Sequence, residues 1–249
     1  MEMISEDKLR YIAGSKGFDL IYIEKDYFLT AFLWLVKDVK GIYLKGGTAL
    51  NKLFLNHTRL SEDLDFSVNR NIPEVRKKID SLISNSGLFT KIETDKTTGD
   101  FVRYRIYYKS YFRKDSNIIA DFNRKASIVL KPERHKVLNF YNLDFSIYTL
   151  SLREIVAEKI RALITRNQPR DYFDAYFVLK KCDIDLALVK KKLADAGETF
   201  DRNRIFKNAN KIYSRWDSEI PKLTNRKLTF LKCVKFIEQK LPNTQKKKT

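Results

Sequence analysis

Two aspartates separated by a single residue form the first pattern in the sequence that could do chemistry. Across residues 63–68 the apolar side chains alternate with Asp63, Asp65 and Ser67, which is typical of a strand with one buried face. Asp63 and Asp65 would then project from the same face, about 7 Å apart. Two such carboxylates repel each other unless a cation lies between them, and hard oxygen ligands suit Mg²⁺. The alternative is an edge strand with an acidic wet face, although aspartate is depleted in strands.

A pair of glycines precedes this pattern. Residues 41–45 are typical of a short strand, and apolar residues recur at helical spacing across residues 49–54. Gly46 and Gly47, followed by Thr48, therefore fall where a helix begins, and free backbone N–H groups there attract phosphate. An ordinary turn that needs a positive φ would also use glycine. Together with the acidic strand, however, the turn has the layout of a nucleotidyl-transfer site, in which one element holds a triphosphate and the other holds metal ions.

The elements that would position these residues follow a simple order along the chain. Residues 5–39 have helical periodicity, residues 41–148 mix short strands with two helices, and residues from 151 to 240 are again helical. We therefore predict an α+β fold with two parts, a core at 1–148 that includes N-terminal helices and a helical domain at 149–249.

A lysine on the packed face of one predicted helix also stands out. In the helix expected over residues 151–164, Lys159 falls within the apolar arc when each residue is stepped by about 100°. Such a lysine needs an anionic partner or a route to water. It would either reach a nucleotide phosphate or extend along the apolar surface to solvent, and the pattern leaves both open.

The next helix begins after Pro169, which ends the preceding one. Asp171 is well placed to be its N-cap. Asp174 could pair with Arg170 or with Lys159.

Two strings in this order, LKGGTAL at 44–50 and RLSEDLDF at 59–66, closely resemble the AbiEii/AbiGii family of bacterial abortive-infection toxins. Members of that family look like nucleotidyltransferases of the polymerase-β type. The resemblance implies a polymerase-β-like fold, with a small mixed sheet followed by a helical C-terminal region. The segment 158–174 also resembles later motifs of the family, in which a lysine and an aspartate support nucleotide binding and catalysis. That implies such roles for Lys159 and for Asp171 or Asp174.

Polymerase-β-type sites usually add a third acid from a neighbouring strand. Residues 117–123 have the pattern of a strand in which Asp121 is the only acid, and residues 101–108 could pair with it. Asp121 is therefore the candidate for the general base or for a further metal ligand. The alternative is an ion pair with Arg103 or Arg105.

The charge balance narrows the choice of acceptor. Lys and Arg total 49 against 31 Asp and Glu, a formal net charge of +18. That surplus favours a polyanionic partner, first nucleic acid and second an anionic membrane surface, although high lysine content also reflects AT-rich genomes. Two cysteines and two histidines argue against a disulfide framework or a zinc enzyme. No apolar run reaches the roughly 20 residues of a membrane span, and the N-terminus lacks a secretory pattern, so we expect a cytoplasmic protein.

These observations predict a Mg²⁺-dependent nucleotidyltransferase that moves a nucleoside monophosphate from an NTP to an acceptor hydroxyl. Gly46, Gly47 and Thr48 would hold the triphosphate, while Asp63 and Asp65 would bind the metal. The charge favours RNA as the acceptor, with tRNA the first candidate. The resemblance implies a toxin of a toxin–antitoxin or abortive-infection system, restrained by a cognate antitoxin. Two alternatives remain, a small-molecule transferase such as one that inactivates aminoglycosides, and a non-catalytic RNA-binding module.

Overall fold

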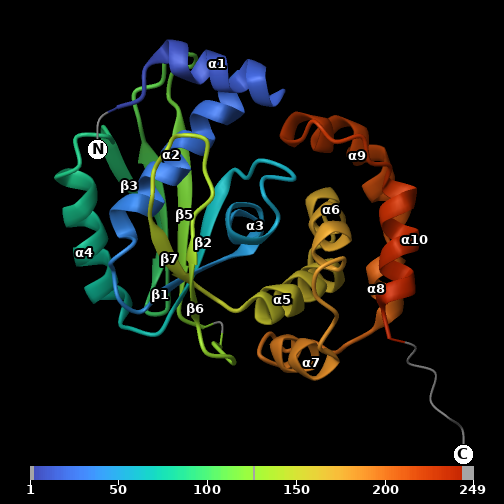
Figure 1. Ribbon diagram of the computed structural model, residues 1–249. Helices are drawn as coiled ribbons and strands as arrows, with labels where there is room; N and C mark the ends of the chain where they lie inside the picture. Colours follow the sequence, from blue (N-terminus) through green and yellow to red (C-terminus); the bar gives the residue numbers. More distant parts are fainter. Residues whose placement is uncertain (1–2, 126, 243–249) are drawn as a thin grey trace, which may run out of the picture. The chain divides into compact units, whose positions relative to one another are not determined.

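The computed structural model describes residues 3–125 and 127–242 (Figure 1). The chain divides into two units. The first runs to Ser151 and includes the short segment Leu223–Asn225, and the second comprises Leu152–Lys222 and the chain from Arg226 onward. The sequence placed the border after residue 148 and did not foresee that a segment of the helical region joins the first unit.

The first unit is built on a sheet whose seven strands, within the described residues, follow the order β3-β4-β5-β2-β1-β7-β6. The strands are β1 Ile42–Lys45, β2 Asp63–Val68, β3 Lys91–Thr98, β4 Phe101–Tyr107, β5 Asn117–Asn123, β6 Glu133–Lys136 and β7 Ser146–Thr149. The pairs β2–β5 and β1–β7 are parallel, and the other four neighbouring pairs are antiparallel. The sheet is therefore mixed, as predicted.

Helices cover one face of this sheet. They are α1 Glu6–Lys16, α2 Leu20–Val36, α3 Gly46–Ala49 with the π-helical turn η1 Leu50–Phe54 directly after it, and α4 Ile72–Ser84. The predicted helical stretch 5–39 is thus two helices, because Gly17 takes a left-handed conformation at the end of α1 and Asp19 caps α2. Helix α2 packs on β5 and α4, and α4 packs on β3 and β4 (Figure 1).

The alternation of residues along the central strands assigns their two faces. Leu64 and Phe66 of β2 are buried, as are Ala120 and Phe122 of β5. The rings of Phe66 and Phe122 stack with centroids 4.8 Å apart, so this face forms the core. The residues between them point the other way and are only partly buried. The polar side chains of β2 and β5 therefore share the opposite face of the sheet.

A buried ion pair holds η1 against α2. The ammonium of Lys52 lies 2.7 Å from the carboxylate of Asp26 and donates to the hydroxyl of Thr30 at 2.8 Å. Tyr141 donates to the same carboxylate at 3.0 Å. A pair removed from water is costly unless its remaining groups are hydrogen-bonded, and here they are. The contact fixes the helical turn that begins at the two glycines.

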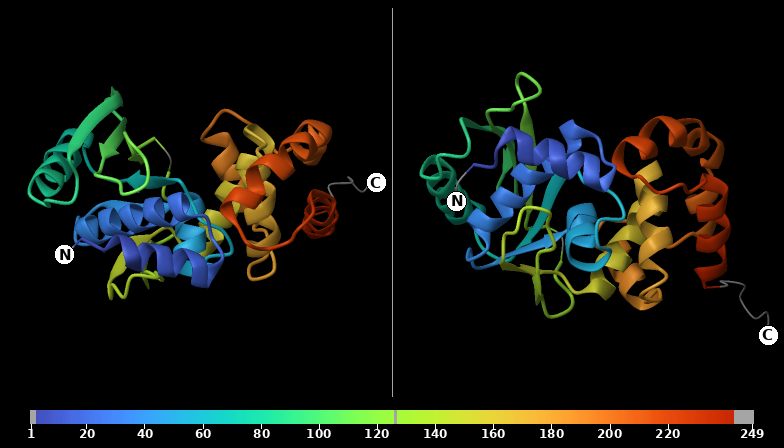
Figure 2. Two further views of the ribbon diagram at one scale, coloured as in Figure 1. Left: turned by 90° about the horizontal axis from the view of Figure 1, so that it is seen from above. Right: turned by 45° about the horizontal axis from the view of Figure 1, so that its top comes forward.

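The second unit is helical, as predicted. Its helices are α5 Leu152–Thr165, α6 Pro169–Val178, α7 Leu186–Ala194, α8 Arg202–Phe206, α9 Ala209–Leu223 and α10 Phe230–Lys240. Helix α5 packs on α6, α7 and α8, and α10 packs along α6 (Figure 2). An aromatic cluster fills the space between α6, α9 and α10, where Tyr172 and Trp216 both contact Phe230. Among the described residues, no helix is long and apolar enough to cross a bilayer.

Candidate active site

The strand register brings the predicted acids together. Lys45 of β1 is opposite Asp65 of β2, Asp65 is beside Asp121 of β5, and Asp121 is opposite Arg103 of β4. Residues that pair across adjacent strands share a face, with Cβ atoms roughly 5 Å apart. These four charged side chains therefore form one row across four strands, and Asp63 lies two residues from Asp65 on the same face. The three aspartates come from strands that are distant in sequence but adjacent in the sheet.

Asp121 forms the ion pair with Arg103 that was the alternative to a catalytic role. It lies beside the Asp63–Asp65 pair, and it also accepts two hydrogen bonds from Arg103, from Nε at 2.8 Å and from Nη2 at 2.6 Å. The hydrogen bond with Asp121 raises the pKa of Arg103, and the charges of Asp121 and Asp65 add to this. Arg105 pairs with Asp95 instead. Each oxygen of Asp121 thus accepts one hydrogen bond from Arg103.

The glycine turn lies directly against this row. Gly46 follows β1 with φ +70°, and a Cβ at this position would collide with the carboxylate of Asp65. A Cβ on Gly47 would lie 2.5 Å from Nη2 of Arg59. The hydroxyl of Thr48 donates to the backbone carbonyl of Asp63 at 2.5 Å, which ties the turn to β2. The carboxylates and the backbone that could receive a phosphate are thus neighbours.

Asn51 and Arg59 hold the glycine turn in place. Neither residue was predicted from the sequence to have a role. The side-chain amide of Asn51 donates to the carbonyl of Gly47 at 3.0 Å and accepts from Thr58 at 2.8 Å and from the backbone of Arg59 at 3.1 Å. Arg59 is buried and donates to the carbonyl of Leu60 at 2.7 Å. Their importance depends on loop geometry, which leaves no periodic signal in a sequence. The one available hint was the position of Arg59 inside the family string.

Lys25 of α2 was also missed. Burial lowers the pKa of Lys25, while the charges of Glu62 and Asp63 oppose this effect. Both carboxylates therefore lie within electrostatic reach of its ammonium. The sequence pattern around Lys25 predicts a core helix and gives no separate signal for this side chain.

Carboxylate oxygens are the donors that the site offers to the predicted Mg²⁺. Asp63 and Asp65 supply carboxylate oxygens from one rigid strand, and Mg²⁺ is commonly held by one or two carboxylates together with substrate phosphates. Asp121 is engaged by Arg103, and among the described residues no group of three or more His, Cys, Asp or Glu is arranged to hold a metal. The residues fit a metal that binds together with a nucleotide, and they do not form a complete protein cage.

The anionic partners of Lys159 are two aspartates of the second unit. Its ammonium lies 3.1 Å from Oδ1 of Asp171 and 3.0 Å from Oδ2 of Asp174, and its side chain is only 4 % exposed. The alternative in which Lys159 extends to solvent is therefore wrong. Asp174 pairs with Lys159, which was one of its two predicted partners.

Asp171 is the centre of this network. Arg166 donates to both of its oxygens, at 3.0 and 2.8 Å. Burial alone would raise the pKa of Asp171, but the charge of Lys159 and the contacts with Arg166 lower it below its usual value. The carboxylate is thus kept ionised in a buried place.

The predicted capping role of Asp171 needs correction. Helix α6 begins at Pro169, and Gln168 is its N-cap. Proline is favoured at the first helical position because its missing N–H is not needed there, so the helix starts earlier than expected. Asp171 is the third residue, and its carboxylate accepts from the backbone N–H of Gln168 at 3.3 Å in a capping box.

The described geometry therefore brings the candidate residues together in two groups. The glycine turn, Asp63, Asp65 and Asp121 belong to the first unit, and Lys159, Asp171 and Asp174 belong to the second.

Comparisons with known proteins agree on the fold. The nucleotidyltransferase toxin MenT4 of Mycobacterium tuberculosis superposes with a TM-score of 0.73 at 19 % identity, over 95 % of this chain and 88 % of that one. The JHP933 protein of Helicobacter pylori has a TM-score of 0.61 at 20 % identity, over 89 % and 92 % of the two chains. No curated protein is close enough in sequence to count as a match.

A family model identifies the chain more directly. The model of the nucleotidyltransferase AbiEii toxin of type IV toxin–antitoxin systems matches residues 27–236. This span contains the glycine turn, the row of acids and the Lys159 network. The chain therefore belongs to the AbiEii family of toxin nucleotidyltransferases.

Proposed function

We propose that this nucleotidyltransferase uses Mg²⁺ and transfers a nucleoside monophosphate from an NTP to a hydroxyl of RNA, with tRNA as the first candidate. The observation that carries the proposal is the contact between Gly46 and Asp65, with Asp121 beside Asp65 in the sheet. A phosphate chain at the turn would lie against carboxylates able to hold its metal ion.

Each group in the first unit has a distinct role in this proposal. The backbone of Gly46 and Gly47, with Thr48, binds the triphosphate, while Asp63 and Asp65 hold the metal. The metal, when bound, neutralises charge that develops on the transferred phosphoryl group. Asp121 takes the proton of the acceptor hydroxyl or joins the metal ligands.

Two cations would add to phosphate binding. The guanidinium of Arg103 is partly exposed and would exchange Asp121 for a phosphate oxygen, because its planar fork suits either anion. Lys25 is close enough to Asp63 to respond to its charge.

The second unit would contribute through Lys159. We propose that the ammonium of Lys159 binds a nucleotide phosphate and that Asp171 and Asp174 orient this ammonium. Arg166 would then compensate Asp171 when Lys159 shifts toward the phosphate.

The acceptor is inferred from charge. The net charge of +18 favours RNA, since a transferase for cationic aminoglycosides should present an acidic cleft. Here Asp65 and Asp121 lie side by side in the row and are flanked by Lys45 and Arg103. A cognate antitoxin encoded beside the toxin would restrain the activity.

A labelling experiment tests the proposal. The protein is incubated with Mg²⁺, each labelled NTP in turn, and either total RNA or a panel of aminoglycosides. We expect label on RNA, its loss in Asp65→Asn and with EDTA, and retention in Asp100→Asn, whose carboxylate pairs with Arg124 at an exposed site. Label only on aminoglycosides would support the small-molecule alternative. RNA binding without label under any condition would support a non-catalytic module.

A further inference from the structure

A cavity in the second unit lies outside the candidate active site. It has a volume of about 660 Å³ and is formed between α9 and residues 227–234. This size lies in the range of small-molecule and cofactor sites. Its apolar lining comes from Tyr213, Trp216, Leu228, Phe230, Leu231 and Val234.

The floor of the cavity is closely packed and hydrogen-bonded. Trp216 donates from its indole nitrogen to the carbonyl of Leu228 at 2.9 Å, and its ring centroid lies 5.4 Å from that of Phe230. Both rings are buried, and Phe230 is also held edge-on by Tyr172 of α6. The cavity is therefore preformed and would need little reorganisation to accept a planar ligand.

An aromatic side chain at the rim of the larger cavity is exposed to solvent. Tyr213 is 63 % exposed although its ring centroid lies 6.3 Å from that of Phe230. Asn210 and Asp217 line the same cavity and can donate to or accept from the edge of a base. An exposed ring with polar groups nearby is the arrangement that stacks and recognises unpaired bases.

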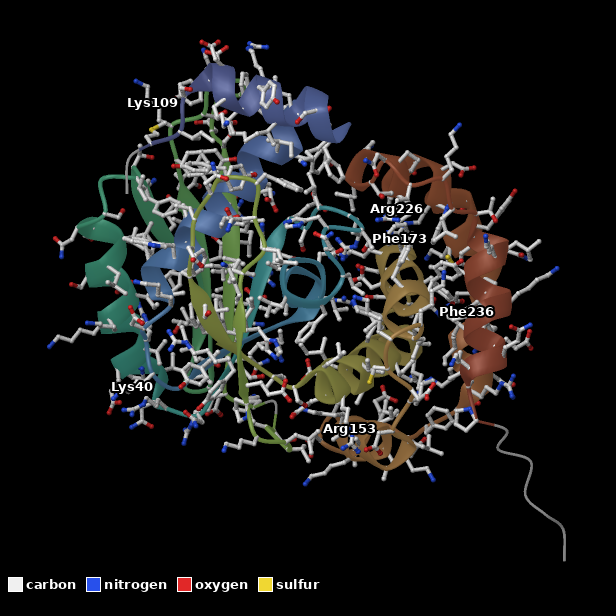
Figure 3. The ribbon with its side chains drawn as sticks, viewed as in Figure 1. Lys40, Lys109, Arg153, Phe173, Arg226 and Phe236 are labelled. Carbon is white, nitrogen blue, oxygen red and sulfur yellow. The ribbon has the colours of Figure 1, made fainter. Side chains whose placement is uncertain are left out.

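A second cavity adjoins the first. It has a volume of about 390 Å³, shares Thr229 and Leu231 with its neighbour, and has Tyr176 and Phe236 in its wall. Phe236 projects from α10, as Figure 3 shows. Two adjoining cavities, each with its own aromatic side chains, offer separate places for two bases of one strand.

The charge around both cavities selects the kind of partner. Residues 202–240 contain eleven lysines and arginines but only three acidic residues. Lys227 lines the larger cavity and Lys232 and Lys235 line the smaller one, all of them exposed. Arg226 directly precedes Lys227 in the chain. A surface with this excess of positive charge attracts a polyanion.

We infer that these two cavities bind a single-stranded segment of the RNA acceptor. One base stacks on Tyr213, the next enters the cavity of Tyr176 and Phe236, and the phosphates lie on Lys227, Lys232 and Lys235. This inference rests on the proposed function for the identity of the RNA as acceptor, but binding itself does not need transfer.

Binding can be measured without chemistry. The full chain carrying Asp65→Asn is titrated into a fluorescein-labelled single-stranded RNA octamer, and anisotropy is followed at fixed salt. Adding Tyr213→Ala should weaken binding roughly tenfold, since one base stack is worth about 1–3 kcal/mol, whereas Tyr213→Phe should bind normally. Tyr11→Ala is the matched control because Tyr11 is 69 % exposed on α1, and it should bind like the parent.

The inference is overturned if Tyr213→Ala binds the octamer as tightly as the parent, or if Tyr11→Ala weakens binding equally. Unchanged RNA affinity would leave a protein as the remaining occupant of the cavities. The two proposals fail separately. Transfer to RNA with no effect of Tyr213→Ala on affinity keeps the proposed function and removes this site. If Tyr213→Ala loses RNA affinity but the wild-type protein transfers no nucleotide, this binding site is kept and the proposed function is removed.

Discussion

Gly46 must be glycine for two physical reasons. Its φ is +70°, a region that costs other residues roughly 1–2 kcal/mol, and any side chain would displace the carboxylate of Asp65. We predict that Gly46→Ala lowers the free energy of unfolding by about 1–2 kcal/mol and lowers nucleotidyl transfer by more than this loss explains. Urea unfolding and the labelling assay measure the two effects.

Gly14 is the matched control for Gly46. It lies within α1, and a Cβ there would meet nothing within 4 Å. Gly14→Ala should therefore stabilise the protein by about 0.5–1 kcal/mol and leave transfer unchanged. Full activity of Gly46→Ala would contradict the assigned geometry.

His57 makes stability depend on pH. Burial lowers its pKa to about 4, with the charges of Lys52 and Lys16 acting in the same direction and that of Asp26 opposing them. Among the described residues, neither ring nitrogen has a hydrogen-bond partner. As pH falls below 6.5, the unfolded state binds a proton that the folded state refuses until about pH 4. Stability therefore falls across this window by up to about 3 kcal/mol and is not affected by His57 above it.

We predict that replacing His57 changes the slope of the free energy of unfolding against pH. Urea unfolding between pH 7.5 and pH 5 should show a smaller loss of stability in His57→Asn, a residue that tolerates the positive φ of 51°. At pH 7.5 the variant should be less stable than the wild type because the ring contact with Phe140 is lost. His135→Asn, at the other histidine, should keep the wild-type slope. An unchanged slope in His57→Asn would mean that another group titrates.

Adjacent strands create properties that no single residue has. Asp65 and Asp121 are neighbours through the parallel pairing of β2 and β5, and Arg103 of β4 neutralises the second of them. Removing Arg103 leaves repelling carboxylates that a cation would stabilise. We predict a larger rise of Tm with added MgCl₂ in Arg103→Ala than in the wild type. Arg105→Ala, which breaks the pair with Asp95, should respond like the wild type, and equal shifts in both variants would count against metal binding at these acids.

Helices α5 and α6 depend on their buried charges. Lys159→Met would leave Asp174 without this cation and Asp171 with Arg166 alone, and breaking a buried ion pair typically costs about 3–5 kcal/mol. We predict a loss of this size in urea unfolding, whereas Lys190→Met on the exposed face of α7 should change little. The double variant Lys159→Met/Asp174→Leu should recover much of the loss, because the buried carboxylate that lost Lys159 is then absent as well. Absence of recovery would show that Lys159 does not act through this pair.

At the scale of the whole molecule, charge should govern RNA affinity. Proteins that neutralise several phosphates release counterions and lose affinity steeply with salt. We predict that affinity for RNA falls at least about tenfold between 50 and 200 mM salt, and that Lys227→Ala reduces the slope of log K against log salt by about one. Filter binding or anisotropy gives both quantities. A flat salt dependence would mean that the net charge of +18 serves another purpose.

The sequence alone predicted the main elements of the candidate site. Alternation along residues 63–68 predicted which side chains of β2 face the core, because burial of one face imposes a period of two. The two glycines predicted the turn, because few other residues adopt its conformation. The helical second half followed from periodicity, and Lys159 stood out because it lies on an apolar face.

Only the tertiary structure revealed which of these residues touch. Asp121 was predicted either as a base or metal ligand or as the ion-pair partner of Arg103 or Arg105. The strand order puts it beside Asp65, and Arg103 is its partner. Asn51, Arg59 and Lys25 escaped notice because their roles depend on loops and on the packing of α2. Periodicity records which face of an element is buried, whereas contacts between distant segments depend on how those elements pair and pack, and that information is spread over the whole chain.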